Sequence, residues 1–106
     1  MENTTSISDS ISQFNERCQA VTDKVNKTFK LSVKFQPVNV TQPKYYNSFY
    51  NKYVRESKAQ AINSLSDLTS QLEKYNLIAP VFLTDWLDWS DIDKILTKIE
   101  QRINKY

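Results

Sequence analysis

Apolar residues recur every three or four positions over residues 6–28, the spacing typical of an amphipathic α-helix. The seam consists of Ile7, Ile11, Phe14, Cys18, Val21, Val25 and Phe29. At about 100° per residue, these positions fall within roughly 80° of arc. So narrow a seam is typical of coiled-coil contacts, so we expect this helix to pack against another helix, from this chain or from a second copy.

From Phe29 the period of the pattern changes to two. Apolar Phe29, Leu31, Val33 and Phe35 alternate with polar residues up to Pro37, and Val38 and Val40 resume the alternation. This pattern predicts a half-buried β-strand with a break at Pro37. A single strand leaves backbone groups unpaired, so the segment must form a hairpin across Pro37, pair with another copy, or be an extended connector rather than a strand.

Residues 43–76 carry the longest helical pattern, beginning at Pro43. The apolar stripe comprises Tyr46, Phe49, Tyr50, Tyr53, Ala61, Leu65, Leu68, Leu72 and Tyr75, and Asn76 is the predicted stop. An unbroken helix here would be about 51 Å long, compared with about 33 Å for a compact domain of this size. The stripe stays in phase, which favours one continuous helix over a break at residues 63–66.

The last third of the chain predicts one or two helical turns near residues 80–89 and then a helix to the C-terminus. Ser90 is the predicted N-cap, with Asp93 completing a capping box. The seam of this helix is Ile92, Ile95, Leu96, Ile99, Ile103 and Tyr106. The expected fold is therefore mainly α, a single domain over residues 1–106: an elongated helical bundle of helix, one β-strand or extended segment, long helix, short turn and helix, with completion by oligomerisation as an open alternative.

The composition of the 106 residues removes most catalytic chemistry that a sequence can display. The chain has no histidine and no glycine. It therefore lacks a Ser-His or Cys-His nucleophile pair, a histidine-containing zinc site, a P-loop and a dinucleotide fingerprint. We expect no enzymatic activity and no cofactor.

Charge and the single cysteine set the expected environment. The net charge is only +2, although residues 30–63 carry six positive charges and one negative charge. No stretch approaches 18 consecutive apolar residues, and the first ten residues lack an apolar run of signal-peptide length. Cys18 excludes an intramolecular disulfide and lies within the first seam, where a buried, unreactive thiol is expected. These features favour a cytoplasmic protein without a membrane segment.

The first candidate interaction surface lies on the predicted long helix, where aromatic and basic residues alternate over positions 44–55. Its exposed candidates are Tyr45, Lys52 and Arg55. The alternatives are an aromatic core with a solvated basic face, a protein contact made by tyrosines, or a platform for single-stranded nucleic acid. The cations and most of the aromatics lie on different helical faces, which disfavours nucleic acid.

The second candidate surface is the segment containing Asp85, Trp86, Asp88 and Trp89. On a helical turn the two tryptophans, three residues apart, would share a face. The alternatives are capping and solvation by the aspartates, a partner contact with tryptophan anchors, or a metal or catalytic site. An EF-hand-type calcium loop is excluded because its glycine and final glutamate are missing.

These observations favour a non-enzymatic interaction protein that binds a protein partner. Its small size and polar composition suggest a regulator or inhibitor of the mobile-element or phage type. We expect it to form a homo-oligomer, because of the narrow first seam and the unpartnered strand. The alternative is a nucleic-acid-binding protein that uses the basic, tyrosine-rich second helix.

Overall fold

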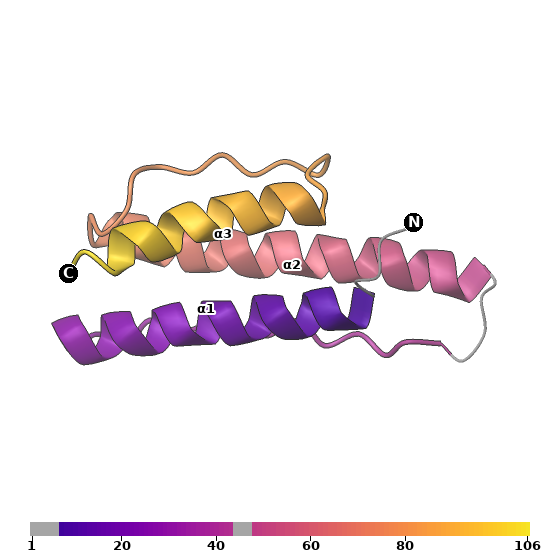
Figure 1. The fold of residues 1–106 in the computed structure, drawn as a ribbon, viewed down its shortest axis with the longest axis horizontal. Helices are drawn as coiled ribbons and strands as arrows, with labels where there is room; N and C mark the ends of the chain where they lie inside the picture. The colour runs from indigo at the N-terminus through magenta and orange to yellow at the C-terminus, as the bar shows by residue number, and fades with distance from the viewer. Residues whose placement is uncertain (1–6, 44–47) are drawn as a thin grey trace.

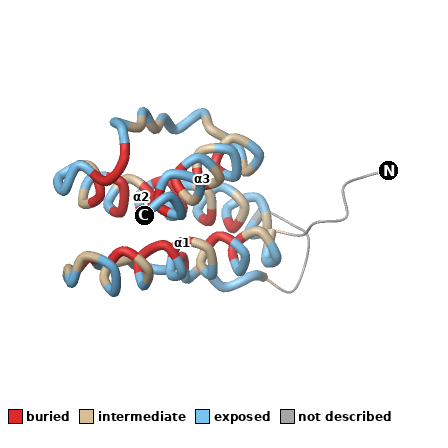
Figure 2. The backbone as a smooth tube through the Cα atoms, turned by 60° about the vertical axis from the view of Figure 1, so that its left-hand side comes forward, coloured by how far each residue is buried: buried red, intermediate tan, exposed pale blue. Residues whose placement is uncertain are grey.

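The computed structural model describes residues 7–43 and 48–106 and contains three helices over these residues (Figure 1). They are α1 (Ile7–Phe29), α2 (Ser48–Lys74) and α3 (Trp89–Ile103). Their inward faces share one apolar core, seen as the buried stretches in Figure 2. Most of the predicted seam residues lie in this core, including Ile11, Cys18 and Val25 of α1 and Ile92, Leu96, Ile99 and Ile103 of α3. The predicted stripe of the long helix is wrong at its two ends, where Phe49 and Tyr75 are exposed, and Tyr106 is exposed beyond α3.

All three helices run in the same direction along the bundle (Figure 1). Ring contacts show this for α1 and α3: Phe14 meets Trp89 near the start of α3, and Phe29 meets Tyr106 beyond its end. Parallel neighbours cannot be joined by short turns, because the chain must return along the whole bundle before the next helix begins. The connecting residues 30–43 and 75–88 are therefore long; the first segment is extended, and the second has turns at residues 75–76 and 85–86.

α2 is continuous, as the in-phase stripe predicts, and has no break at residues 63–66. Its 27 residues give the molecule its length, because the principal extents are 45 × 24 × 22 Å. Pro43, the predicted start, is not helical; α2 begins at Ser48 in the described part of the chain, and residues 44–47 lie outside it. Asn76 ends the pattern as predicted: it takes a left-handed φ of 60°, and the Leu77 N–H bonds the Leu72 carbonyl at 2.9 Å.

α1 ends at Phe29 by the same device. Lys30 has a φ of 56°, and the Leu31 N–H bonds the Asn26 carbonyl at 3.3 Å. This position favours glycine, and the chain contains none. A lysine therefore takes the left-handed conformation at the end of α1.

The predicted strand is an extended connector, and the described residues contain no β-strand. The period-two pattern nevertheless identified its inward side chains. Val33 and Val38 are buried, and Leu31, Phe35 and Val40 pack against the core. No hairpin forms across Pro37; the segment lies between α1 and α2 and runs antiparallel to both.

Side-chain amides of the two helices bond the backbone of this connector at Val33, Lys34, Val38 and Asn39, and we call this arrangement the amide bracket. On the α1 side, Asn26 accepts from the Val33 N–H at 2.8 Å and donates to the Val33 carbonyl at 2.9 Å. Asn15 makes the same pair of bonds with Val38, at 2.8 and 3.0 Å. Each asparagine thus offers one donor and one acceptor, as a neighbouring β-strand would.

On the α2 side, Gln71 accepts from the Lys34 N–H at 2.9 Å and donates to the Lys34 carbonyl at 2.7 Å. Gln60 accepts from the Asn39 N–H at 3.3 Å. Adjacent connector residues thus bond to opposite helices, as the alternating directions of an extended backbone require.

The spacing of the amide bracket follows from helix and strand geometry. The two α1 amides are 11 residues apart in sequence, and so are the two α2 amides. Eleven helical residues rise about 16.5 Å and return to nearly the same face. The connector residues that they bond are five apart, and five extended residues also span about 16.5 Å. The two amides of each helix therefore meet the connector in register.

Replacing an amide of the bracket should destabilise the fold. We expect Asn26→Ala and Asn15→Ala each to lower the free energy of unfolding by about 1–3 kcal/mol, because a part-buried backbone N–H and carbonyl lose their partners together. Urea denaturation followed by circular dichroism measures the loss. Gln101→Ala, on the exposed side of α3, is the control and should change stability by less than about 0.5 kcal/mol. Equal losses in all three variants would contradict the bracket.

Candidate functional site

The connection between α2 and α3 carries the two most exposed large apolar side chains of the described residues. It runs along α3, largely exposed, in Figures 1 and 2. Val81, Leu83 and Leu87 pack against the core, whereas Phe82 and Trp86 are 89% and 88% exposed. Their outward position follows from inward anchoring of their neighbours. We call Phe82, Trp86 and the adjoining groove along α3 the connector face. It belongs to the connection of residues 75–88 and not to the connector of residues 30–43.

Hydrogen bonds at both ends hold this connection in place. Near its start, Tyr106 donates its hydroxyl to the Leu77 carbonyl at 3.1 Å, and the Val81 N–H donates to Glu73 Oε2 at 3.3 Å. At its end, the Asp88 N–H donates to Asp91 Oδ2 of α3 at 3.1 Å, and the Leu87 N–H bonds the Thr84 carbonyl within the connection at 3.3 Å. The exposed aromatics therefore project from a backbone fixed to both α2 and α3.

A groove of about 640 Å³ lies between the connection and α3. Its apolar lining includes Ile78, Pro80, Val81, Phe82, Ile95 and Ile99. Lys98 and Arg102 also line the groove, and both are exposed. Among the described residues, neither of these two side chains has a hydrogen bond or ion pair. The groove thus combines apolar walls with two uncompensated positive charges.

The structure separates the two tryptophans that sequence spacing places on one face. Residues 85 and 86 form a turn, and α3 begins only at Trp89, so the predicted helical turns near residues 80–89 are wrong. Trp89 is half-buried and packs edge-on against Phe14 of α1, with ring centroids 6.2 Å apart. Of the pair, Trp86 faces solvent and Trp89 is a core contact.

Asp88, rather than the predicted Ser90, is the N-cap of α3. Its carboxylate accepts from the Asp91 N–H at 3.0 Å, and the Asp91 carboxylate accepts from the Asp88 N–H at 3.1 Å. The same motif thus starts two residues earlier than expected, with Asp91 in the place predicted for Asp93. The bond from the Asp91 backbone is the main cause that lowers the pKa of Asp88, and the charge of Lys58 on α2 contributes.

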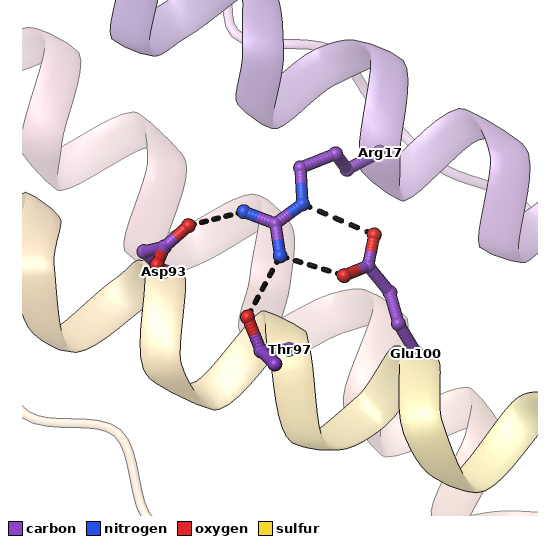
Figure 3. Close-up of polar contacts among 4 residues, drawn as sticks. All are labelled: Arg17, Asp93, Thr97 and Glu100. Atoms are coloured by element: carbon purple, nitrogen blue, oxygen red, sulfur yellow. Dashed lines mark hydrogen bonds and ion pairs between the residues drawn. The ribbon is translucent and has the colours of Figure 1, made fainter.

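Asp93 instead joins a cluster around Arg17 that sequence reasoning missed (Figure 3). Arg17 donates from Nε and Nη2 to Glu100 at 3.0 and 2.6 Å, donates to Thr97 Oγ1 at 3.0 Å, and pairs with Asp93. The bonds to Glu100 raise the pKa of Arg17. The three acceptors are spaced four and three residues apart, so they occupy one face of α3. This spacing is the only sign of the cluster that the sequence contains. The cluster fixes α1 against α3.

The tyrosine-rich segment shows only part of its predicted surface. Tyr45 lies outside the described residues. Lys52 and Arg55 are exposed on α2, and Tyr53 is buried in the core. Within the described part of α2, this arrangement separates a buried aromatic from the exposed cations.

The acidic segment brings no metal-binding group together among the residues that the structure describes. Asp88 and Asp91 form the capping box and Asp93 pairs with Arg17, so these carboxylates already have partners. Asp85 is exposed and remains beside Trp86. Over the same described ranges, each helix is too short or too polar to cross a membrane.

The position of the α3 cap can be tested by substitution. We expect Asp88→Ala to lower the melting temperature by a few degrees, because it removes the acceptor for the Asp91 N–H, and Ser90→Ala to change it little.

The contribution of the Asp88 cap to stability should also depend on pH. In the folded chain the pKa of Asp88 lies below its ordinary value of 3.8. The stabilisation by this carboxylate is therefore complete above pH 3.8 and is lost as the pH falls through the lowered pKa. Thermal melts from pH 7 to pH 2 measure both effects; a larger loss for Ser90→Ala would contradict this cap.

Cys18 should be unreactive in the folded protein. The thiol is fully buried, and burial raises its pKa from 9.0 to about 12. This lowers the thiolate fraction at neutral pH about a thousandfold. A maleimide followed by mass spectrometry should label Cys18 rapidly in denaturant and very slowly without it. Rapid labelling of the folded chain would show that the first helix opens readily.

No protein-family model matches the chain, and no curated protein or solved structure is significantly similar to it. The functional inference accordingly rests on the connector face and the residues around it.

Proposed function

We propose that this protein is a non-enzymatic binding protein, a small regulator or inhibitor that acts by covering the surface of a partner protein with its connector face. The observation that carries this proposal is the outward position of Phe82 and Trp86, each about nine-tenths exposed on an anchored backbone. Exposing large aromatic rings to water is costly, and tryptophan is enriched among residues that dominate protein interfaces.

Two further features support a protein as the partner. The anchored backbone reduces the entropy that binding would otherwise cost. The unpaired charges of Lys98, Arg102 and Asp85 surround the apolar surface, as polar rims surround the apolar centre of protein interfaces. The face carries both signs of charge, which suits a protein surface better than the uniformly negative backbone of a nucleic acid.

The proposal predicts a binding defect without a folding defect. Tagged wild-type chain and the double variant Phe82→Ala/Trp86→Ala would be used to capture proteins from the source cells. We expect the variant to bind the captured partner at least about tenfold more weakly, because it loses both anchors. Its melting temperature should stay close to that of the wild type, since both side chains are exposed.

Two matched variants sharpen this experiment. Phe49→Ala removes another exposed aromatic, from α2, and should leave partner binding unchanged. Lys52→Ala/Arg55→Ala tests the basic face of α2. Full binding by Phe82→Ala/Trp86→Ala would overturn the proposal. Salt-sensitive binding to random oligonucleotides that only Lys52→Ala/Arg55→Ala abolishes would instead support a nucleic-acid-binding protein.

A further inference from the structure

We infer that a second copy of this chain occupies the connector face in the absence of another partner. Trp86 of each copy enters the groove of the other, and Asp85 meets Lys98 and Arg102. The inference rests on the proposed function in one respect, that the connector face holds a protein. It goes further by naming the occupant and its contacts.

The charges of this face are divided between its two ends. Asp85, whose carboxylate has no partner among the described residues, lies where the connection meets the start of α3, next to Asp88 and Asp91 of the capping box. Lys98 and Arg102 line the groove toward the other end of the helix. Between Asp91 and Arg102 the helix rises about 16.5 Å. A two-fold axis across the face would therefore place the acidic end of each copy on the basic end of its neighbour, twice in one interface.

The dipeptide Asp85-Trp86 matches the chemistry of the groove. The indole of Trp86 is exposed and suits apolar walls that include Ile78, Pro80 and Ile95. The guanidinium of Arg102 at the groove can contact the indole face as a cation–π partner. The adjacent carboxylate of Asp85, which has no polar partner among the described residues, reaches the same cations.

The available apolar area is of the right order for a dimer. A buried aromatic side chain covers about 150–250 Å². Phe82 and Trp86 from two copies would therefore supply roughly 600–1,000 Å² of the total of about 1,200 Å² at which stable interfaces begin. A uniformly acidic partner would suit only Lys98 and Arg102, and a uniformly basic one only the aspartates. A second copy supplies both signs and the apolar anchors.

Sedimentation equilibrium of the full chain over a wide concentration range tests the inference. We expect the wild type to rise from 12.4 kDa toward twice that mass. Trp86→Ala should raise the dissociation constant of the dimer at least about tenfold. Asp85→Lys and Lys98→Glu/Arg102→Glu should each weaken the dimer similarly, because each places like charges together at both halves of the interface.

An equimolar mixture of these two charge variants provides the decisive test. In one half of a mixed dimer, the lysine introduced by Asp85→Lys faces the two glutamates introduced by Lys98→Glu/Arg102→Glu. In the other half, the natural Asp85 of one copy faces the natural Lys98 and Arg102 of its partner, so opposite charges meet in both halves. We expect the mixture to regain the dimer mass that each variant alone has lost, whereas a defect in folding would not be corrected by mixing.

The matched control for these charge reversals is Lys27→Glu/Lys34→Glu. It reverses two exposed lysines, one on α1 and one in the connector that follows it, away from the connector face. This variant should dimerise as the wild type does, because neither lysine takes part in the proposed contact.

A wild-type mass of 12.4 kDa at every concentration would overturn the inference, as would a dimer that none of these variants weakens or a mixture that does not recover. These results are distinguishable from failure of the proposed function. If the wild type is monomeric and the Phe82→Ala/Trp86→Ala variant loses the captured partner, only the assignment of a second copy as the occupant is overturned. A dimer with no cellular partner would uphold the inference and overturn partner binding.

Discussion

The backbone of residues 30–43 imposes the constraint on which the rest of the structure depends. An extended segment packed between two helices must satisfy its polar groups without a neighbouring strand. Asn15 and Asn26 on one side and Gln60 and Gln71 on the other supply that pairing from side chains. Because eleven helical residues and five extended residues cover the same distance, the bracket also sets how α1 and α2 lie relative to each other.

The parallel direction of the helices follows from this arrangement and has a consequence at the surface. Once the first connector has returned along the bundle, α2 runs beside α1 in the same direction, and the chain must return again before α3. The second connection has no amide bracket, and it lies outside α3 rather than between helices. Its inward residues, such as Val81 and Leu83, hold it to the core, which leaves Phe82 and Trp86 facing solvent.

The aspartates near α3 show how local geometry divides similar residues among different roles. Asp88 and Asp91 cap the helix, where its positive end favours carboxylates. Asp93 lies on the α1 side and pairs with Arg17, which fixes the register of the two helices. Asp85 precedes the cap and neither caps the helix nor pairs with Arg17. Its charge beside Trp86 is therefore available to a binding partner. The functional proposal depends on this last residue and its neighbour.

The sequence by itself determined most of the three helical seams, the unbroken second helix, its end at Asn76 and the inward side of the extended segment, because periodicity reports directly which side of a segment is buried. It failed at Phe49 and Tyr75, which are in phase with the stripe but lie near the two ends of α2 and are exposed. It could not distinguish a strand from a bracketed connector, since both bury alternate residues and differ only in what pairs with the backbone. It named Asp85 and Trp86 as candidates, but the separation of Trp86 from Trp89, the Arg17 cluster and the groove with Lys98 and Arg102 were decided by tertiary structure. Each of these depends on where helices far apart in the sequence come to lie, and the parallel path of the chain sets those positions.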